Sequence, residues 1–175
     1  MFSKKIQALI CLLLINAPLL RGAMPSFVAT HLDDTAQEKT MEFSGAQITK
    51  VAKLLGYEYP QKNLVYWEAE GMRAWLLDGR GRSGRFQAAF VVAEGKIIHC
   101  EVIQYIGSHG KDITQASYLK QFRGAFLKGG DNRLDRRIDA VSGATISSAA
   151  MEKLARIALV LDADISQQNS EHVDK

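Results

Sequence analysis

Apolar residues recur along the chain in patterns that predict strands and helices. Four apolar runs of strand-like composition follow one another at residues 64–69, 72–77, 85–92 and 96–105. Glu70-Gly71 separates the first two runs and Ala93-Glu94-Gly95 separates the last two, and both segments are typical of tight turns. Short connections favour antiparallel pairing over repeated strand–helix–strand units. The pattern predicts an α+β fold with an antiparallel sheet of about four or more strands and packed helices.

Helical spacing predicts three helices around this sheet. The first begins after Ser44, stops at Gly56 and has an apolar face made of Ile48, Val51, Leu54 and Leu55. A short helix is expected at about 114–122, ending at Gly124, and a polar basic loop follows at 128–137. A long helix then carries one apolar face of Ile146, Ala150, Leu154, Ile157 and Leu161. Residues 25–40 are polar and irregular, which predicts a loose leader.

The first 23 residues have the layout of a targeting segment. Lys4 and Lys5 precede an apolar run at 6–15, and the small pair Gly22-Ala23 follows it. This order is typical of a secretory signal peptide, and the run is shorter than the roughly 20 residues that a transmembrane helix needs. We expect a signal peptide, with an uncleaved anchor as the alternative. The protein is then exported, periplasmic or membrane-associated and facing the periplasm.

The charge balance changes once this segment is set aside. The chain has 22 Lys and Arg against 19 Asp and Glu, and residues 1–23 contain three of the basic residues and no acid. The rest of the chain is therefore formally neutral, which argues against nucleic acid as a partner. Cys11 leaves with the segment, so Cys100 has no partner for an internal disulfide. Its apolar surroundings in the sequence predict a buried structural thiol.

The histidines give no metal signature in the sequence. The four residues are scattered at positions 31, 99, 109 and 172, without the spacing of zinc ligands. The sequence therefore predicts no metal site.

The most informative stretch is a small-residue turn at 138–144 that opens directly into the long helix. Ser142 suits the N-cap, Gly143 allows close approach to the backbone, and Thr145 lies in the first helical turn. Free backbone N–H groups and the positive end of the helix dipole make such a turn a natural phosphate site. Ordinary helix capping explains the same residues, so capping chemistry alone does not establish a ligand.

The complete string Asp139-Ala140-Val141-Ser142-Gly143-Ala144-Thr145 resembles the flavinylation motif D-x-x-[ST]-G-A-T of the FMN-binding domain family. That family includes FMN-carrying subunits of sodium-translocating NADH:quinone reductases and of Rnf-type complexes. The resemblance implies that a flavin transferase uses FAD to join FMN, through its phosphate, to Thr145. It also implies that Ser142, Gly143 and Ala144 shape the turn and that the transferase requires Asp139.

A looser resemblance covers about residues 75–161 and implies that residues 63–165 form the FMN-binding domain. Residues 24–62 are then a leader with an N-terminal helix, and residues 166–175 are a polar tail. Gln121-Phe122 resembles the family's "qF-G" element. Many members carry a glutamate or an E-T-P-G-type turn where this chain has Gly107-Ser108-His109-Gly110. Ser108 and His109 are candidate flavin contacts, with an exposed loop as the alternative.

Two basic segments are further candidates for contact with the flavin. The loop at 78–85 lacks the Gly-Lys-[Ser/Thr] ending of a P-loop, and no RNA-binding motif accompanies it. A solvated turn is its simplest interpretation; in the family's order, Arg82 or Arg85 contacts the FMN. Arg136 and Arg137 either help to dock the transferase or the FMN phosphate, or are an exposed loop pair.

Three functions fit these observations. The first is an exported flavoprotein that carries FMN covalently and relays electrons between redox partners, such as cytochromes or membrane reductase subunits, without substrate catalysis of its own. The second is a small flavin-dependent reductase with its own substrate. The third is a non-redox exported ligand-binding or adhesion domain whose helix start imitates the motif. No G-x-S-x-G motif or nicotinamide fingerprint points to another enzyme class.

Overall fold

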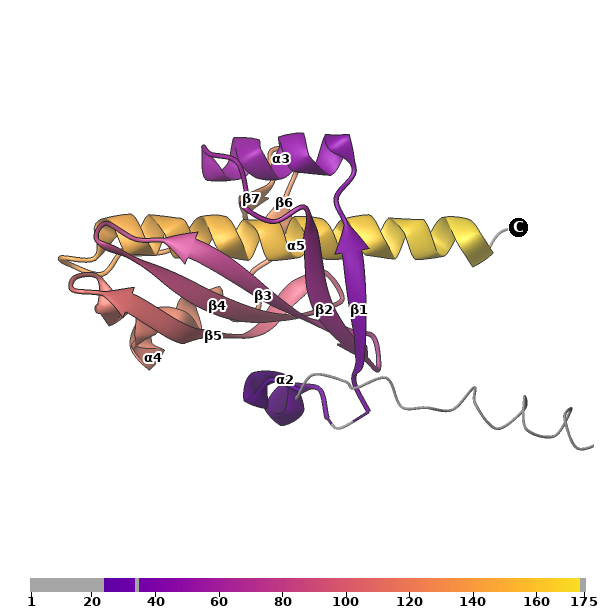
Figure 1. Cartoon of the computed structure of the whole chain (residues 1–175), viewed down its shortest axis with the longest axis horizontal. Helices are drawn as coiled ribbons and strands as arrows, with labels where there is room; N and C mark the ends of the chain where they lie inside the picture. The colour runs from indigo at the N-terminus through magenta and orange to yellow at the C-terminus, as the bar shows by residue number, and fades with distance from the viewer. Residues whose placement is uncertain (1–23, 34, 174–175) are drawn as a thin grey trace, which may run out of the picture.

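A computed structural model describes residues 24–33 and 35–173, so the predicted signal peptide lies outside the described residues. The described chain forms an antiparallel sheet with the long helix α5 (Thr145–Val173) and the helix α3 (Gly45–Leu55) on one face. The short helix α2 (Ser26–His31) covers the other face (Figure 1). In this part of the chain, no helix is both long enough and apolar enough to cross a membrane.

The sheet contains five strands in sequence order: β1 (Gln37–Glu42), β2 (Asn63–Ala69), β3 (Met72–Arg80), β4 (Gly84–Ala93) and β5 (Lys96–Gly107). All neighbours pair antiparallel. Glu70 and Gly71 both have positive φ, as do Glu94 and Gly95, which is the backbone of tight two-residue hairpin turns. The predicted α+β fold is confirmed, and the four predicted strands correspond to β2, β3, β4 and β5.

The α3 helix follows its predicted limits. The Ser44 hydroxyl accepts a hydrogen bond from the Gln47 amide and the Gln47 side chain accepts one from the Ser44 amide, while Gly56 ends the helix at φ 83°. Its buried face differs from the prediction, because Ile48 is 42% exposed and Gln47 is buried instead. Gln47 turns inward because its side chain also donates to Asp164 of α5, at 3.3 Å.

The predicted loose leader is wrong, because residues 26–31 form α2 and residues 37–42 form β1. Phe27, Val28 and Leu32 are buried against the outer face of the sheet. β1 is an edge strand that pairs with β2 through its backbone while most of its side chains stay exposed. A polar sequence does not exclude such a strand, since backbone hydrogen bonds form it.

The connection between β5 and α5 is more structured than the sequence predicted. The expected short helix consists of three pieces: η1 (Lys111–Thr114), α4 (Ala116–Leu119) and η2 (Lys120–Phe122). The expected basic loop contains a small hairpin of β6 (Leu127–Lys128) and β7 (Arg133–Leu134). The α5 helix also continues to Val173, through most of the predicted polar tail.

Alternating residues of the sheet contribute to two separate apolar clusters. The main cluster lies between the sheet and α5; its fully buried members include Trp75, Leu77, Phe90, Leu154 and Ile157. Cys100 also belongs to it, so its predicted burial is confirmed, and burial raises the pKa of its thiol to about 12. The second, smaller cluster lies between the sheet and α2.

Candidate functional site

Thr145 is the first residue of α5, and its side chain is exposed. The first helical hydrogen bond runs from the Ser148 amide to the Ala144 carbonyl, at 2.8 Å. The amides of residues 145–147 therefore precede the helical ladder, at the positive end of a 29-residue helix dipole. The predicted position of Thr145, in the first turn of a helix, is confirmed.

The turn before the helix differs from the predicted capping. Gly143 has φ 76°, and the Ala144 amide donates to the Val141 carbonyl at 2.9 Å, so a tight turn separates Ser142 from the helix. Ser142 is exposed and precedes the helix by three residues, so its predicted N-cap role is wrong. The Ser148 hydroxyl, inside the helix, instead accepts a hydrogen bond from the Val141 amide at 3.1 Å.

Three hydroxyl side chains lie close together here, and only one is exposed. Ser147 and Ser148 are buried, and both hydroxyls have protein partners: Tyr105 for Ser147 and Val141 for Ser148. Thr145 is exposed to solvent. Of the three, it is the hydroxyl that a large reagent can reach without unfolding the helix.

Thr145 faces a small pocket of about 140 Å³. Loops from three parts of the chain line it: Arg82 from the β3–β4 turn, His109 and Gly110 from the segment after β5, and residues 143–147 from the start of α5. Arg82 is the cation of this lining, and the helix dipole adds to its positive potential. The pocket therefore favours an anionic group the size of a phosphate.

Glycines allow these loops to meet. A Cβ on Gly81 would lie 2.7 Å from Ser147 Oγ, and one on Gly110 would lie 2.7 Å from the Tyr105 hydroxyl oxygen. The Tyr105 hydroxyl group lies 3.1 Å from Ser147 Oγ and also donates to the His109 carbonyl. The buried Ser147 hydroxyl thus lies where the first turn of α5 meets the loops that contain Gly81 and Gly110.

His109 and Ser108 are both exposed, and the structure separates their positions. His109 lines the pocket, whereas Ser108 does not. Ser108 Oγ lies 2.9 Å from His109 Nδ1, and Ser83 Oγ accepts a hydrogen bond from the His109 amide at 3.2 Å. Ser108 and Ser83 therefore hold the His109 loop against the β3–β4 turn.

Close backbone packing surrounds Gly107 at the end of β5. Gly107 pairs with Gly84 of β4, and a Cβ on Gly107 would lie 3.0 Å from Gly84 Cα and 3.2 Å from the Tyr105 ring. A side chain here would therefore require Gly84 or the Tyr105 ring to shift by a few tenths of an ångström.

Asp139 lies outside the pocket lining, and its side chain is 83% exposed, 3.7 Å from Arg137 Nε. Its backbone is fixed by Gln121, which accepts a hydrogen bond from the Asp139 amide at 2.8 Å and donates one to its carbonyl at 3.2 Å. Gln121 thus positions the backbone of Asp139. In the sequence, Gln121 stands out only through the "qF-G" resemblance.

The remaining arginines do not meet at the pocket. Arg85 lines a different pocket, with Tyr57 and Phe86. Arg136 is held by its neighbour Asp135 and donates to the carbonyls of Arg123 and Gly124. Arg136 is therefore held by hydrogen bonds to Asp135 and to the two carbonyls. Arg137 is an exposed loop residue.

Comparison with known proteins finds a family that is similar to part of the chain. Residues 81–160 match the model of the family described as the FMN-binding domain. The matched segment contains Arg82, His109, Gln121, Asp139 and Thr145, and it includes the complete pocket lining.

The crystal structure of Shewanella oneidensis NqrC has the same fold. It aligns with a TM-score of 0.57 over 78% of this chain and 82% of that chain, at 12% sequence identity. At this identity the likeness shows the fold alone. No curated protein matches the sequence.

The pocket fits one end of FMN. An exposed hydroxyl, unpaired amides at a helix start and Arg82 are suitable partners for the FMN phosphate. A volume of about 140 Å³ is below the roughly 300–1,000 Å³ of sites that enclose a ligand of drug size. The pocket thus accommodates the phosphate end, and the isoalloxazine ring has no enclosed place in it.

Proposed function

We propose that this protein is an exported flavoprotein that carries FMN covalently on Thr145 and relays electrons between redox partners at or near the membrane. The observation that carries the proposal is the exposure of Thr145 at the start of α5, beside two buried hydroxyls. The family match supports FMN as the cofactor.

Attachment requires a flavin transferase and FAD. The Thr145 hydroxyl displaces AMP from FAD by forming a bond to the phosphorus of the FMN half. The phosphoanhydride bond breaks, and the hydroxyl proton is released. The product is a threonine phosphoester, so the protein gains the mass of FMN less one water.

This chain's residues then hold the phosphate and leave the ring accessible. Arg82 and the first amides of α5 neutralise the remaining phosphate charge. Bound FMN supplies one- and two-electron redox chemistry. An isoalloxazine ring outside an enclosed pocket suits electron exchange with another protein better than catalysis on a small substrate.

Export explains the value of a covalent bond. Free FMN that dissociates in a compartment without flavin supply is not replaced, whereas a phosphoester keeps the cofactor on the protein. The composition of residues 1–23 supports export to the periplasm or to the periplasmic side of the membrane. The expected electron partners are cytochromes or membrane reductase subunits.

The test is the intact mass of the protein co-produced with a flavin transferase. We expect wild type to gain FMN less one water and Thr145→Ala to gain nothing. Thr49→Ala, which removes an exposed threonine from α3, is the matched control and should be modified like wild type. An unmodified wild type, under conditions that modify another member of the family, would refute covalent attachment.

Electron relay and export are tested separately. The reduced holo-protein should reduce a c-type cytochrome from the same periplasm without added substrate, as followed by haem absorbance. Cell fractionation should recover it with periplasmic or membrane markers. Absence of electron transfer to any such partner, together with turnover of a small substrate, would favour the reductase alternative.

A further inference from the structure

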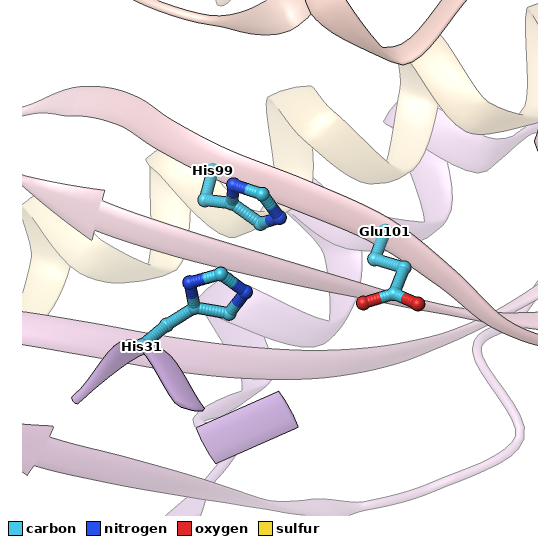
Figure 2. Close-up of side chains that lie close together, drawn as sticks. All are labelled: His31, His99 and Glu101. Atoms are coloured by element: carbon cyan, nitrogen blue, oxygen red, sulfur yellow. The ribbon is translucent and has the colours of Figure 1, made fainter. Parts of the chain in front are cut away.

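His31, His99 and Glu101 form a side-chain cluster on the outer face of the sheet. Each offers one ligand atom, and these atoms lie within 4.8 Å of one another. Figure 2 shows the two imidazole rings facing each other, with the Glu101 carboxylate beside them. The ring centroids of His31 and His99 are 3.8 Å apart. The cluster does not include any residue of the flavin pocket.

The fold, and not the sequence spacing, brings these residues together. His99 and Glu101 alternate along β5 with Cys100 and Val102, which point into the main core, so both polar side chains belong to the opposite face. His31 is the last residue of α2, and Phe27 and Val28 hold that helix on the same face.

We propose that this cluster binds one divalent transition-metal ion, with zinc as the reference ion. Two imidazoles and one carboxylate are a recurrent ligand set for zinc and related divalent ions, and a water molecule or another ligand takes the fourth position. The proposal departs from the sequence-based expectation of no metal site, which rested on sequence spacing alone.

The observed separation requires only side-chain movement. Bonds of about 2.0–2.1 Å in a tetrahedral site place ligand atoms roughly 3.4 Å apart. The ligand atoms, which lie within 4.8 Å of one another, must therefore come closer through rotations about side-chain bonds of His31 and Glu101. The rotation of His31 must also turn its ring, which is stacked on His99, so that an in-plane nitrogen lone pair points to the ion. Both residues lie where such rotations are possible, because Glu101 is exposed and His31 is at a helix end.

Access from solvent and the charges of neighbouring residues also affect the proposed metal site. His99 and Glu101 line a neighbouring pocket of about 350 Å³ together with Lys120 and Arg123, which gives an ion a route from solvent. Arg123 opposes a cation and Glu101 favours one.

Calorimetric titration of the whole protein with Zn²⁺, after removal of metals by a chelator, tests the site. We expect one equivalent to bind, and His31→Gln and His99→Gln each to weaken binding on the order of 10-fold or more. Glu101→Gln should weaken it as well. Glu94→Gln, at the turn of the same β4–β5 hairpin, is the matched control and should bind like wild type.

A second measurement, amide hydrogen exchange, tests whether zinc binds between α2 and β5. Zinc should slow amide hydrogen exchange at residues 26–31, because the ion joins α2 to β5, and should not do so in His99→Gln. Failure of the wild type to bind zinc overturns the proposal. Binding that the double variant His31→Gln/His99→Gln retains in full also overturns it, provided that the variant has a wild-type circular dichroism spectrum.

Discussion

Ser147 shows how a single buried hydroxyl can position a functional residue that lies two positions away. It contacts the Tyr105 hydroxyl, and the backbones of Gly81 and Gly110 pass so close that neither has space for a Cβ. Thr145 itself makes little contact with the core, since its side chain is exposed. The backbone at Thr145 is therefore held by its buried neighbour Ser147, so the hydroxyl proposed as the acceptor takes no part in the packing that positions it.

Gly110→Ala should be clearly destabilising. Gly110 has φ 89°, and a Cβ there would lie 2.7 Å from the Tyr105 hydroxyl oxygen and would also meet Ser147. We expect unfolding free energy to fall by about 2–3 kcal/mol from strain and steric overlap together. Urea denaturation measures the change.

Gly129→Ala separates the effect of backbone strain from that of steric overlap. Gly129 also has a positive φ, 67°, but a Cβ added there meets nothing within 4 Å. It should cost only about 1 kcal/mol, from backbone strain alone. If Gly110→Ala and Gly129→Ala lower the unfolding free energy equally, the close packing around Ser147 contributes nothing measurable to stability.

At the scale of elements, Asp135 joins the two ends of the β6–β7 hairpin. Its carboxylate accepts hydrogen bonds from the Arg136 side chain and from the Phe126 amide. The Arg136 guanidinium, followed in importance by the Phe126 amide, holds the pKa of Asp135 below its usual value. This interaction is available only while Asp135 is ionised.

The expected pH dependence follows from that direction. Because the pKa of Asp135 is lower in the folded than in the unfolded protein, its stabilisation is present above the ordinary value near 3.8 and is lost as pH falls through the folded value. Asp135→Asn should therefore reduce the steepness with which unfolding free energy declines below about pH 4. Denaturation at several pH values measures both slopes, and identical slopes would contradict the assignment.

The elements with strong local patterns were predictable from the sequence, and those made by distant contacts were not. The Glu70-Gly71 turn and the Ser44 cap are encoded by adjacent residues. In contrast, β1 forms because β2 offers it an edge, and α2 forms because an apolar surface lies beside it. The sequence motif likewise predicted that Thr145 lies at a helix start, whereas the approach of Gly81 and Gly110 to the same turn depends on the fold.

At the scale of the whole molecule, the sheet has a different partner on each face. The main core is built with α5, and the outer face is covered by α2 over Trp67, Ala74, Ala89 and Val91. The flavin pocket uses the first turn of α5 and the loops at one end of the sheet, and none of its residues belongs to α2. The two faces should therefore respond separately to mutation.

Phe27→Ala should release α2 without disturbing the flavin site. Phe27 is 3% exposed, and a buried Phe→Ala substitution typically costs about 3–5 kcal/mol. Here the loss is limited to the docking energy of α2, because the main core lies on the other face of the sheet. We expect faster amide exchange at residues 26–31 and unchanged flavin attachment at Thr145.

Phe126→Ala provides the comparison, since Phe126 is one of the exposed apolar residues and lies outside both clusters. It should leave exchange in α2 unaltered. Loss of flavin attachment in a folded Phe27→Ala protein would show that the two faces are coupled after all.

The long α5 helix joins an exposed first residue to the most deeply buried part of the domain. Met151, Leu154 and Ile157 are fully buried only about two to three turns after Thr145. Local opening of this helix therefore requires disruption of the main core. The proposed attachment at Thr145 would therefore hold the cofactor by one short side chain on a rigid helix and not by a flexible segment. An electron-transfer partner would then meet it at a distance set by how the two surfaces dock, so that changes at the docking surface, more than motion of the attachment, would control the rate.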